Sequence, residues 1–189
     1  MRANAAMTAE YDQAPARALQ AITAIDKPVV AMVNGHCYGG GCSVLLACDL
    51  RVAAGHARFA VPAARLGLAY PMEFGVERLV RVVGATWAAE MLLTARSLTA
   101  EEARQIGLVG HVVPRAELEE FTRDYALRLA ENAPLTLAAH KRAIQACLQP
   151  GPVDRAAIHG AITRCFNSAD YQEGIAAFIE KRTPKFRGR

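Results

Sequence analysis

The feature that most constrains this chain is an apolar segment that runs into a glycine-rich loop and out into a second apolar segment. Residues 29–33 have the composition of a strand, and residues 44–48 have that of a buried helix. Between them lie Gly35 and a glycine triplet at 39–41. A strand that turns through glycines into a helix start presents unpaired backbone N–H groups, and the helix dipole favours negative charge there. The sequence therefore predicts backbone donors aimed at an oxygen that becomes negative.

Two common phosphate-binding loops do not match this segment. In a P-loop, a Lys and then a Ser or Thr follow the last glycine, but with Gly35 and Gly40 at the right spacing those positions hold Gly41 and Cys42. In the dinucleotide fingerprint G-x-G-x-x-G, the second glycine position is Cys37. By elimination, the residues favour an oxyanion hole for a thioester or a similar carbonyl. A tight strand-to-helix packing turn is the alternative that the glycines alone leave open.

The composition is that of a globular domain with a mild positive charge. The 189 residues are 52% hydrophobic and 21% charged, which is enough to bury one core. The net charge of +4 does not indicate a nucleic-acid partner. No apolar run is long enough to span a bilayer, and residues 1–7 hold no apolar signal core. The five cysteines form no Cys-x-x-Cys pair, which predicts reduced thiols, a cytoplasmic protein and no metal site.

The first part of the chain is predicted to alternate between helices and strands. Apolar spacing predicts a helix over residues 8–25, which ends before Pro28. A second helix is predicted over 73–95, broken near Gly84. Thr99 and Glu102 match a capping box that starts a short third helix. Three short strands are predicted over 50–53, 58–61 and 108–113.

From residue 115 onward the pattern is almost entirely helical. Helices are predicted over four segments that Pro and Gly separate: 115–131, 134–148, 152–167 and 169–181. Strands alternating with helices favour an α/β layer, whereas a run of helices alone favours a separate helical region. We therefore expect an α/β core over 1–114 and a helical, oligomer-forming region over 115–189.

A series of segments is shared, in order, with one known family. They are residues 27–42, 47–53, 57–62, 65–67, 98–103, 107–109, 168–174 and 178–182. On these segments the chain resembles the enoyl-CoA hydratase/isomerase (crotonase) family. The resemblance implies an α/β fold of stacked β-β-α units, the ClpP/crotonase class, with C-terminal helices that build a homotrimer or a dimer of trimers (a hexamer). It also implies that the family's N-terminal strands, with the second oxyanion-hole N–H, are missing from this chain.

The resemblance implies roles for residues of the glycine loop and of the C-terminal end. Gly40 matches the backbone donor that holds the thioester oxygen, while Gly39 and Gly41 give the loop its geometry. Phe178 and Lys181 match positions that contact coenzyme A. Coenzyme A would then enter as part of the acyl-CoA thioester substrate, and no separate cofactor is expected.

Four further residues are candidates at this site. Hydratases of the family use two glutamates, whose positions are Ser43 and Ala63 here, so that neither carboxylate is present. Tyr70 lies in a loop similar to one in the family's methylmalonyl-CoA decarboxylases, where the tyrosine faces the substrate carboxylate; a half-buried ring in a turn is the alternative. Glu73 is a candidate to replace a missing carboxylate, or else a solvated glutamate near a helix start.

The sequence thus predicts an acyl-CoA-processing enzyme of fatty acid metabolism, of the hydratase/isomerase type (a lyase or isomerase), which holds a thioester enolate at Gly40. A decarboxylase-like enzyme that uses Tyr70 is one alternative. A non-catalytic acyl-CoA-binding or assembly protein is the other, because both family glutamates are replaced.

Overall fold

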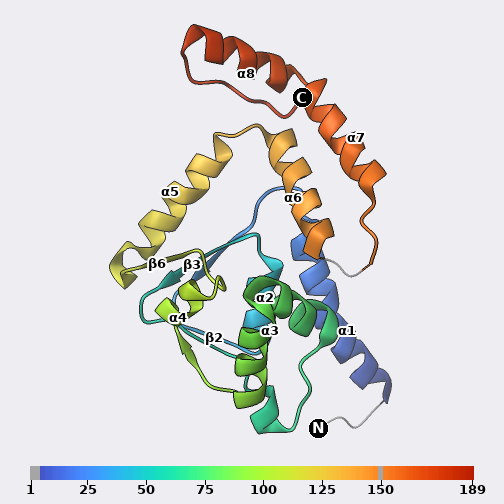
Figure 1. The fold of residues 1–189 in the computed structure, drawn as a ribbon, viewed down its shortest axis with the longest axis vertical. Helices are drawn as coiled ribbons and strands as arrows, with labels where there is room; N and C mark the ends of the chain where they lie inside the picture. The colour runs from blue at the N-terminus through green and yellow to red at the C-terminus, as the bar shows by residue number, and fades with distance from the viewer. Residues whose placement is uncertain (1–4, 149–150) are drawn as a thin grey trace. The chain divides into compact units, whose positions relative to one another are not determined.

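The computed structural model describes residues 5–148 and 151–189, with the side chains of 5–13 excepted. It divides into two units, whose elements are labelled in Figure 1. The first unit comprises Met1–Ile25 and Val29–Leu118, and the second comprises Asp26–Pro28 and Glu119–Arg189. Each unit is described by itself below.

The first unit alternates strands and helices. Its elements are α1 (Ala5–Ala24), β1 (Val30–Val33), β2 (His36–Tyr38), α2 (Gly40–Ala47), β3 (Leu50–Ala54), β4 (Arg58–Ala60), the 3-10 helix η1 (Pro62–Leu66), the π-helical turn η2 (Met72–Val76), α3 (Glu77–Thr94), β5 (Leu98–Thr99), α4 (Ala100–Gln105), β6 (His111–Val113) and the 3-10 turn η3 (Arg115–Glu117).

Two three-stranded sheets organise this unit. One has the order β1-β3-β6 and is parallel throughout, with Val33 beside Ala53. The other has the order β2-β4-β5, in which Tyr38 lies beside Ala60 and β5 runs antiparallel to β4. Successive units β1-β2-α2 and β3-β4-α3 each send their first strand to one sheet and their second strand to the other. This is the stacked β-β-α arrangement that the family resemblance implied.

The core of the first unit lies between the sheets and helices α2, α3 and α4. Its largest fully buried side chains include Phe59, Leu45, Leu79, Met91 and Leu98. Burial of one such side chain contributes about 1.5–3 kcal/mol. The core therefore fixes α2 against β2 and β4, the elements that carry the glycine loop.

Some element boundaries differ from those predicted. The helix after the glycine loop begins at Gly40 rather than at residue 44, because the Gly39 carbonyl accepts the first helical hydrogen bonds. The strands β2 and β5 were not predicted, since each has at most three residues and depends on pairing with β4. The predicted strand over 108–113 is shorter, because the Leu108 N–H donates to Ala103 O and closes α4.

The second unit is helical. It contains α5 (Leu118–Ala130, whose first residue belongs to the first unit), α6 (Pro134–Leu148), α7 (Arg155–Phe166) and α8 (Ala169–Glu180). Helix α7 begins three residues later than predicted because the Asp154 carboxylate caps it, accepting from Ala157 N at 3.0 Å. Among the described helices of the whole chain, none has the length and apolar content to cross a membrane.

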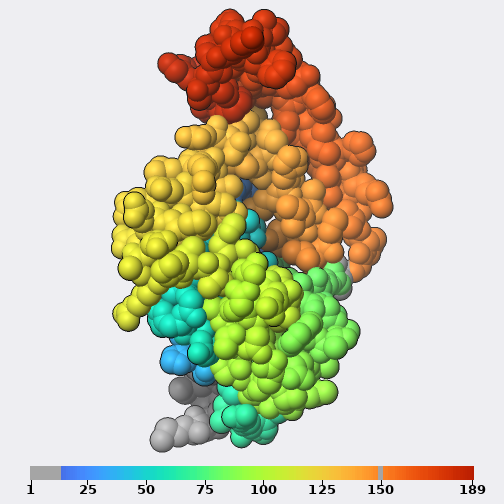
Figure 2. Space-filling view, turned by 60° about the vertical axis from the view of Figure 1, so that its left-hand side comes forward, coloured from blue at the N-terminus to red at the C-terminus, as the bar shows by residue number. Residues whose placement is uncertain are grey.

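The C-terminal tail of this unit runs back along α8 (Figure 1). The buried Asp170 carboxylate accepts from the backbone N–H groups of Arg187 and Gly188, both at 2.7 Å. The Phe186 ring lies 3.6 Å from where a Cβ on Gly174 would be. In the space-filling view, α8 and its tail form one continuous body (red in Figure 2). The C-terminal tail therefore packs against α8 and is hydrogen-bonded to it.

Candidate functional site

The glycine loop forms a sharp turn from β2 into α2. Gly39 has φ 51°, in the left-handed region that favours glycine. Its N–H donates to Ala60 O of β4 at 2.9 Å. Its carbonyl accepts from the N–H groups of Cys42 at 2.9 Å and of Ser43 at 3.3 Å. Both ends of the Gly39 backbone are therefore fixed, one by the sheet and the other by the helix.

The Gly40 N–H is left as an available donor at the start of α2. The first N–H groups of a helix have no acceptor within the helix. In the described part of the chain, the N–H groups of Gly40 and Gly41 have no acceptor elsewhere either, and both residues are exposed. A Cβ on Gly40 would meet no atom within 4 Å. Gly40 is thus exposed and uncrowded where a Cβ would stand, and its N–H has no acceptor in the described chain.

Two arginine side chains lie at the C-terminal end of α2, opposite the Gly40 N–H. The buried Arg78 guanidinium donates to Leu46 O at 3.0 Å, and Arg51 donates to Cys48 O at 3.1 Å. Burial lowers the pKa of both guanidinium groups. Cations near the C-terminal carbonyls stabilise a helix through its dipole. The N-terminal end, which is the positive end of the dipole, keeps its free donors for an anion.

The Tyr70 hydroxyl lies at this turn. It donates to the Gly39 carbonyl at 3.0 Å and lies 2.7 Å from Ser43 Oγ. Burial, the main cause, raises the pKa of the Tyr70 phenol well above its usual range. The phenol therefore stays protonated at neutral pH and keeps a proton to donate.

The Cys42 thiol is a structural group. Its Sγ–H donates to Cys37 O at 2.9 Å, and Ala60 O lies 3.5 Å from the same sulfur, so that the first turn of α2 contacts both β2 and β4. The contact with the Cys37 side chain and burial both raise the pKa of the Cys42 thiol. A neutral, buried thiol is a poor nucleophile.

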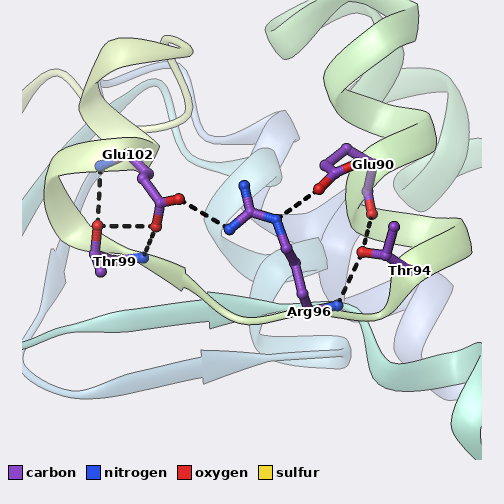
Figure 3. A network of polar contacts seen from close by, with 5 residues as sticks. All are labelled: Glu90, Thr94, Arg96, Thr99 and Glu102. Atoms are coloured by element: carbon purple, nitrogen blue, oxygen red, sulfur yellow. Dashed lines mark hydrogen bonds and ion pairs between the residues drawn. The ribbon is translucent and has the colours of Figure 1, made fainter.

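A network of polar side chains supports the strand beside β4 (Figure 3). Arg96 Nε lies 2.7 Å from Glu90 Oε1, and Arg96 Nη1 lies 2.8 Å from Glu102 Oε1. The predicted capping box is confirmed, with the Thr99 N–H donating to Glu102 Oε2 at 2.8 Å. This backbone bond first, and Arg96 second, lower the pKa of Glu102 to about 2. The network fixes β5, which pairs with β4 and so supports the strand that holds Gly39.

The structure brings together five of the residues that the sequence singled out. Gly39, Gly40 and Gly41 form the start of α2, and the side chains of Ser43 and Tyr70 meet beneath that turn. Ser43 is buried, with 6% of its surface exposed. Its role as a substrate-binding residue stays a prediction, because its hydroxyl contacts Tyr70.

The remaining candidates lie elsewhere. Ala63 is in η1, shortly after β4, and packs partly against the core. Glu73 is exposed on the π-helical turn that follows Tyr70. Phe178 and Lys181 belong to α8 and its C-cap in the second unit, where Phe178 is 85% exposed. The roles given to these four residues stay predictions.

The sequence did not predict that Gly75 packs against the Tyr70 ring. Gly75 lies in the π-helical turn, and a Cβ there would come 2.8 Å from Tyr70 Cδ1 and Cε1. Such turns carry no simple residue pattern, although they recur at functional sites.

In the described part of the chain, no group of three or more His, Cys, Asp or Glu side chains could hold a metal ion.

The turn, the free helix-start donors and the β-β-α repeat agree with one family. The family model for enoyl-CoA hydratase/isomerase matches residues 1–189. The chain belongs to this family, and its fold is crotonase-like, as the sequence predicted.

Named relatives and a solved structure support this membership. The 2,3-dehydroadipyl-CoA hydratase of Escherichia coli is 39% identical over 172 residues, which cover 89% of this chain and 66% of the relative. The short-chain-enoyl-CoA hydratase of Clostridium acetobutylicum is 38% identical over 84% of this chain and 60% of the relative. The crystal structure of an enoyl-CoA hydratase from Bacillus anthracis matches with a TM-score of 0.91 and 32% identity, over 100% of this chain and 74% of that one. The chain thus spans 60% to 66% of the length of these two curated relatives.

Proposed function

We propose that this chain processes acyl-CoA thioesters in the manner of an enoyl-CoA hydratase or isomerase. The observation that carries the proposal is the Gly40 N–H, an exposed donor without an acceptor in the described chain, at the positive end of α2. The names of the relatives, both hydratases of CoA thioesters, support the same substrate class. The compartment that we propose is the cytoplasm, where buried thiols such as that of Cys42 stay reduced.

The chemistry follows from where charge develops. When a proton leaves the carbon next to a thioester carbonyl, or when water adds to its double bond, negative charge gathers on the carbonyl oxygen. A donor fixed in place before the reaction stabilises that charge more than it stabilises the neutral substrate. Gly40 is fixed in this way, because the Gly39 carbonyl on the same peptide is held by α2 and by Tyr70.

Proton transfer needs a group other than Ser43 or Ala63. Within residues 58–77 the acidic side chains are Glu73 and Glu77, and Glu73 is exposed on the turn after Tyr70. We assign the acid/base role to Glu73. The decarboxylase alternative is not favoured, since the Tyr70 hydroxyl donates to Gly39 O rather than facing an open space.

The assembly that we propose is a homotrimer or a dimer of trimers, formed through the second unit. Its helices leave large apolar side chains exposed, with Phe178 at 85% and Ile179 at 73%. A cavity of about 500 Å³ in the same unit is lined by Phe166, Tyr171 and Phe178. Exposed apolar surface of this kind marks an interface.

The test is a matched pair of substitutions at one position. Gly40→Pro removes the N–H, and proline is tolerated at the first position of a helix. Gly40→Ala keeps the N–H and adds a Cβ into open space. With a short-chain enoyl-CoA as substrate, we expect Gly40→Pro to lower kcat about 10²–10³-fold and Gly40→Ala to lower it far less. Equal turnover in the two variants, or no turnover by the unaltered chain, would contradict the proposal.

A further inference from the structure

The peptide between Gly39 and Gly40 links the oxyanion donor to the groups behind it. Its carbonyl oxygen belongs to Gly39 and its N–H to Gly40, and the described chain has no cis peptide bond. In a trans peptide, C=O and N–H lie in one plane and point in opposite directions. Whatever holds the Gly39 carbonyl therefore also sets the direction in which the Gly40 N–H points.

Three donors hold that carbonyl. The N–H groups of Cys42 and Ser43 are those that any helix start provides. The third donor is the Tyr70 hydroxyl at 3.0 Å, which comes from 31 residues farther along the chain. This bond is the contribution that is particular to this sequence, because a side chain from another segment closes onto the back of the peptide.

The single phenol proton fixes the direction of the contact with Ser43. Because Tyr70 uses its proton on Gly39 O, its oxygen can only accept from the second partner, so Ser43 Oγ donates across the 2.7 Å contact. The result is a relay from Ser43 to Tyr70 to the Gly39 carbonyl. Hydrogen bonds in series polarise one another, and a carbonyl that accepts more strongly makes the N–H of the same amide a stronger donor.

The ring of Tyr70 is held in the orientation that this relay needs. It packs against Gly75 in the π-helical turn, where a Cβ would come within 2.8 Å of two ring carbons. Real Cβ atoms essentially never lie so close, so Gly75 leaves the room that the ring occupies. On its inner side the ring packs against the core of the first unit.

We propose that Tyr70 is a positioning residue, which aligns and polarises the Gly39–Gly40 peptide so that the Gly40 N–H meets the thioester oxygen, with Ser43 directing the Tyr70 proton. The inference rests on the proposed function, in which Gly40 is the oxyanion donor. It gives Tyr70 a role without substrate contact. It also explains how a serine can be useful at a position where the family's hydratases carry a glutamate.

The experiment uses Tyr70→Phe, which keeps the ring and removes only the hydroxyl, together with Ser43→Ala and the double variant. The control is Tyr38→Phe. Tyr38 is the residue before Gly39, and its hydroxyl contacts Ser97 Oγ at 3.0 Å. Two properties are measured: the ¹⁵N chemical shift of the Gly40 amide in the ligand-free protein, and kcat and KM with a short-chain enoyl-CoA.

We expect Tyr70→Phe to move the Gly40 ¹⁵N resonance upfield and to lower kcat about tenfold at nearly constant KM. Ser43→Ala should change both properties less, and it should add nothing in the Tyr70→Phe background, because its effect passes through Tyr70. Tyr38→Phe should leave both properties unchanged.

A Gly40 resonance and a kcat that do not respond to Tyr70→Phe would overturn the inference, whatever happens to thermal stability. Additive effects of the two substitutions would overturn the relay. Because the amide shift needs no substrate, it separates two failures. A chain that turns over no thioester contradicts the proposed function, whereas an unmoved Gly40 amide contradicts the positioning role.

Discussion

The two units of this protein differ in the side chains that they bury. In the described chain, the largest fully buried side chains, Phe59 and Leu45 among them, all belong to the first unit. The second unit buries small or polar residues such as Ala161 and Asp170, and leaves Phe178 and Ile179 exposed. The first unit therefore carries its own core and can hold a backbone donor rigidly. Among the described residues of the second unit, no large apolar side chain is buried.

The sharpest way to break this comparison is to truncate one phenylalanine in each unit. Phe59 is fully buried in β4, next to Ala60, whose carbonyl accepts from the Gly39 N–H, so Phe59→Ala should lower the free energy of unfolding by about 3–5 kcal/mol. Phe178→Ala, at an 85% exposed position, should lower it by less than about 0.5 kcal/mol in the monomer. Urea unfolding measures both changes. Phe59→Leu serves where Phe59→Ala fails to fold, and similar losses at the two sites would refute the comparison.

The same Phe178→Ala variant should act on assembly instead. A buried aromatic anchor at an interface is worth at least about 2 kcal/mol, so we expect roughly a 30-fold weaker association. Sedimentation equilibrium measures this association. Leu93→Ala, at a 78% exposed position of α3 in the first unit, is the matched control and should not change it. If Leu93→Ala weakens the assembly and Phe178→Ala does not, the interface lies on the first unit, and the proposed assembly through the second unit is contradicted.

A smaller effect is expected from the polar network that supports β5. The pKa of Glu102 is lowered from 4.5 to about 2, so its contribution to stability is complete above pH 4.5 and is lost as the pH falls toward 2. Because the side chain is 34% exposed and screened by solvent, this contribution is below about 1 kcal/mol.

Glu102→Gln should therefore flatten the loss of stability between about pH 5 and pH 2, as measured by urea unfolding at several pH values. Glu90→Gln removes the other carboxylate on Arg96 but leaves the capping box, and it is the matched control. If the two variants and the unaltered chain lose stability in parallel, the Glu102 carboxylate does not stabilise the first unit.

Features set by neighbouring residues were predictable from the sequence. The glycine loop predicted free backbone donors at a helix start, although the helix was expected to begin at residue 44 and only the family resemblance assigned the donor to Gly40. The Thr99 and Glu102 pair predicted a capping box, because that pattern obeys a rule that operates within four residues. The succession of short strands and helices predicted the α/β layer. The four helices after residue 115 were likewise predicted, with boundaries that shifted by a few residues at caps such as Asp154.

Features set by packing were not predictable. The Tyr70 hydroxyl meets Gly39 across 31 residues, and Gly75 makes room for the Tyr70 ring only because a π-helical turn brings the two together. The strand β5 has two residues and forms because β4 lies beside it. Periodicity carries no information about such contacts. The sequence therefore left two interpretations of Tyr70 open, a contact with the substrate or a half-buried ring in a turn, and it did not predict the hydrogen bond to the Gly39 carbonyl.

The most direct test of the account is the infrared spectrum of a ¹³C-labelled thioester carbonyl in a bound, saturated acyl-CoA. If the Gly40 N–H holds the thioester oxygen, the carbonyl stretch should move to lower frequency on binding to the unaltered chain and to Gly40→Ala. It should stay near its solution value in Gly40→Pro, because that variant has no N–H to donate. An unshifted band in the unaltered chain, or the same shift in all three proteins, would contradict the role of Gly40.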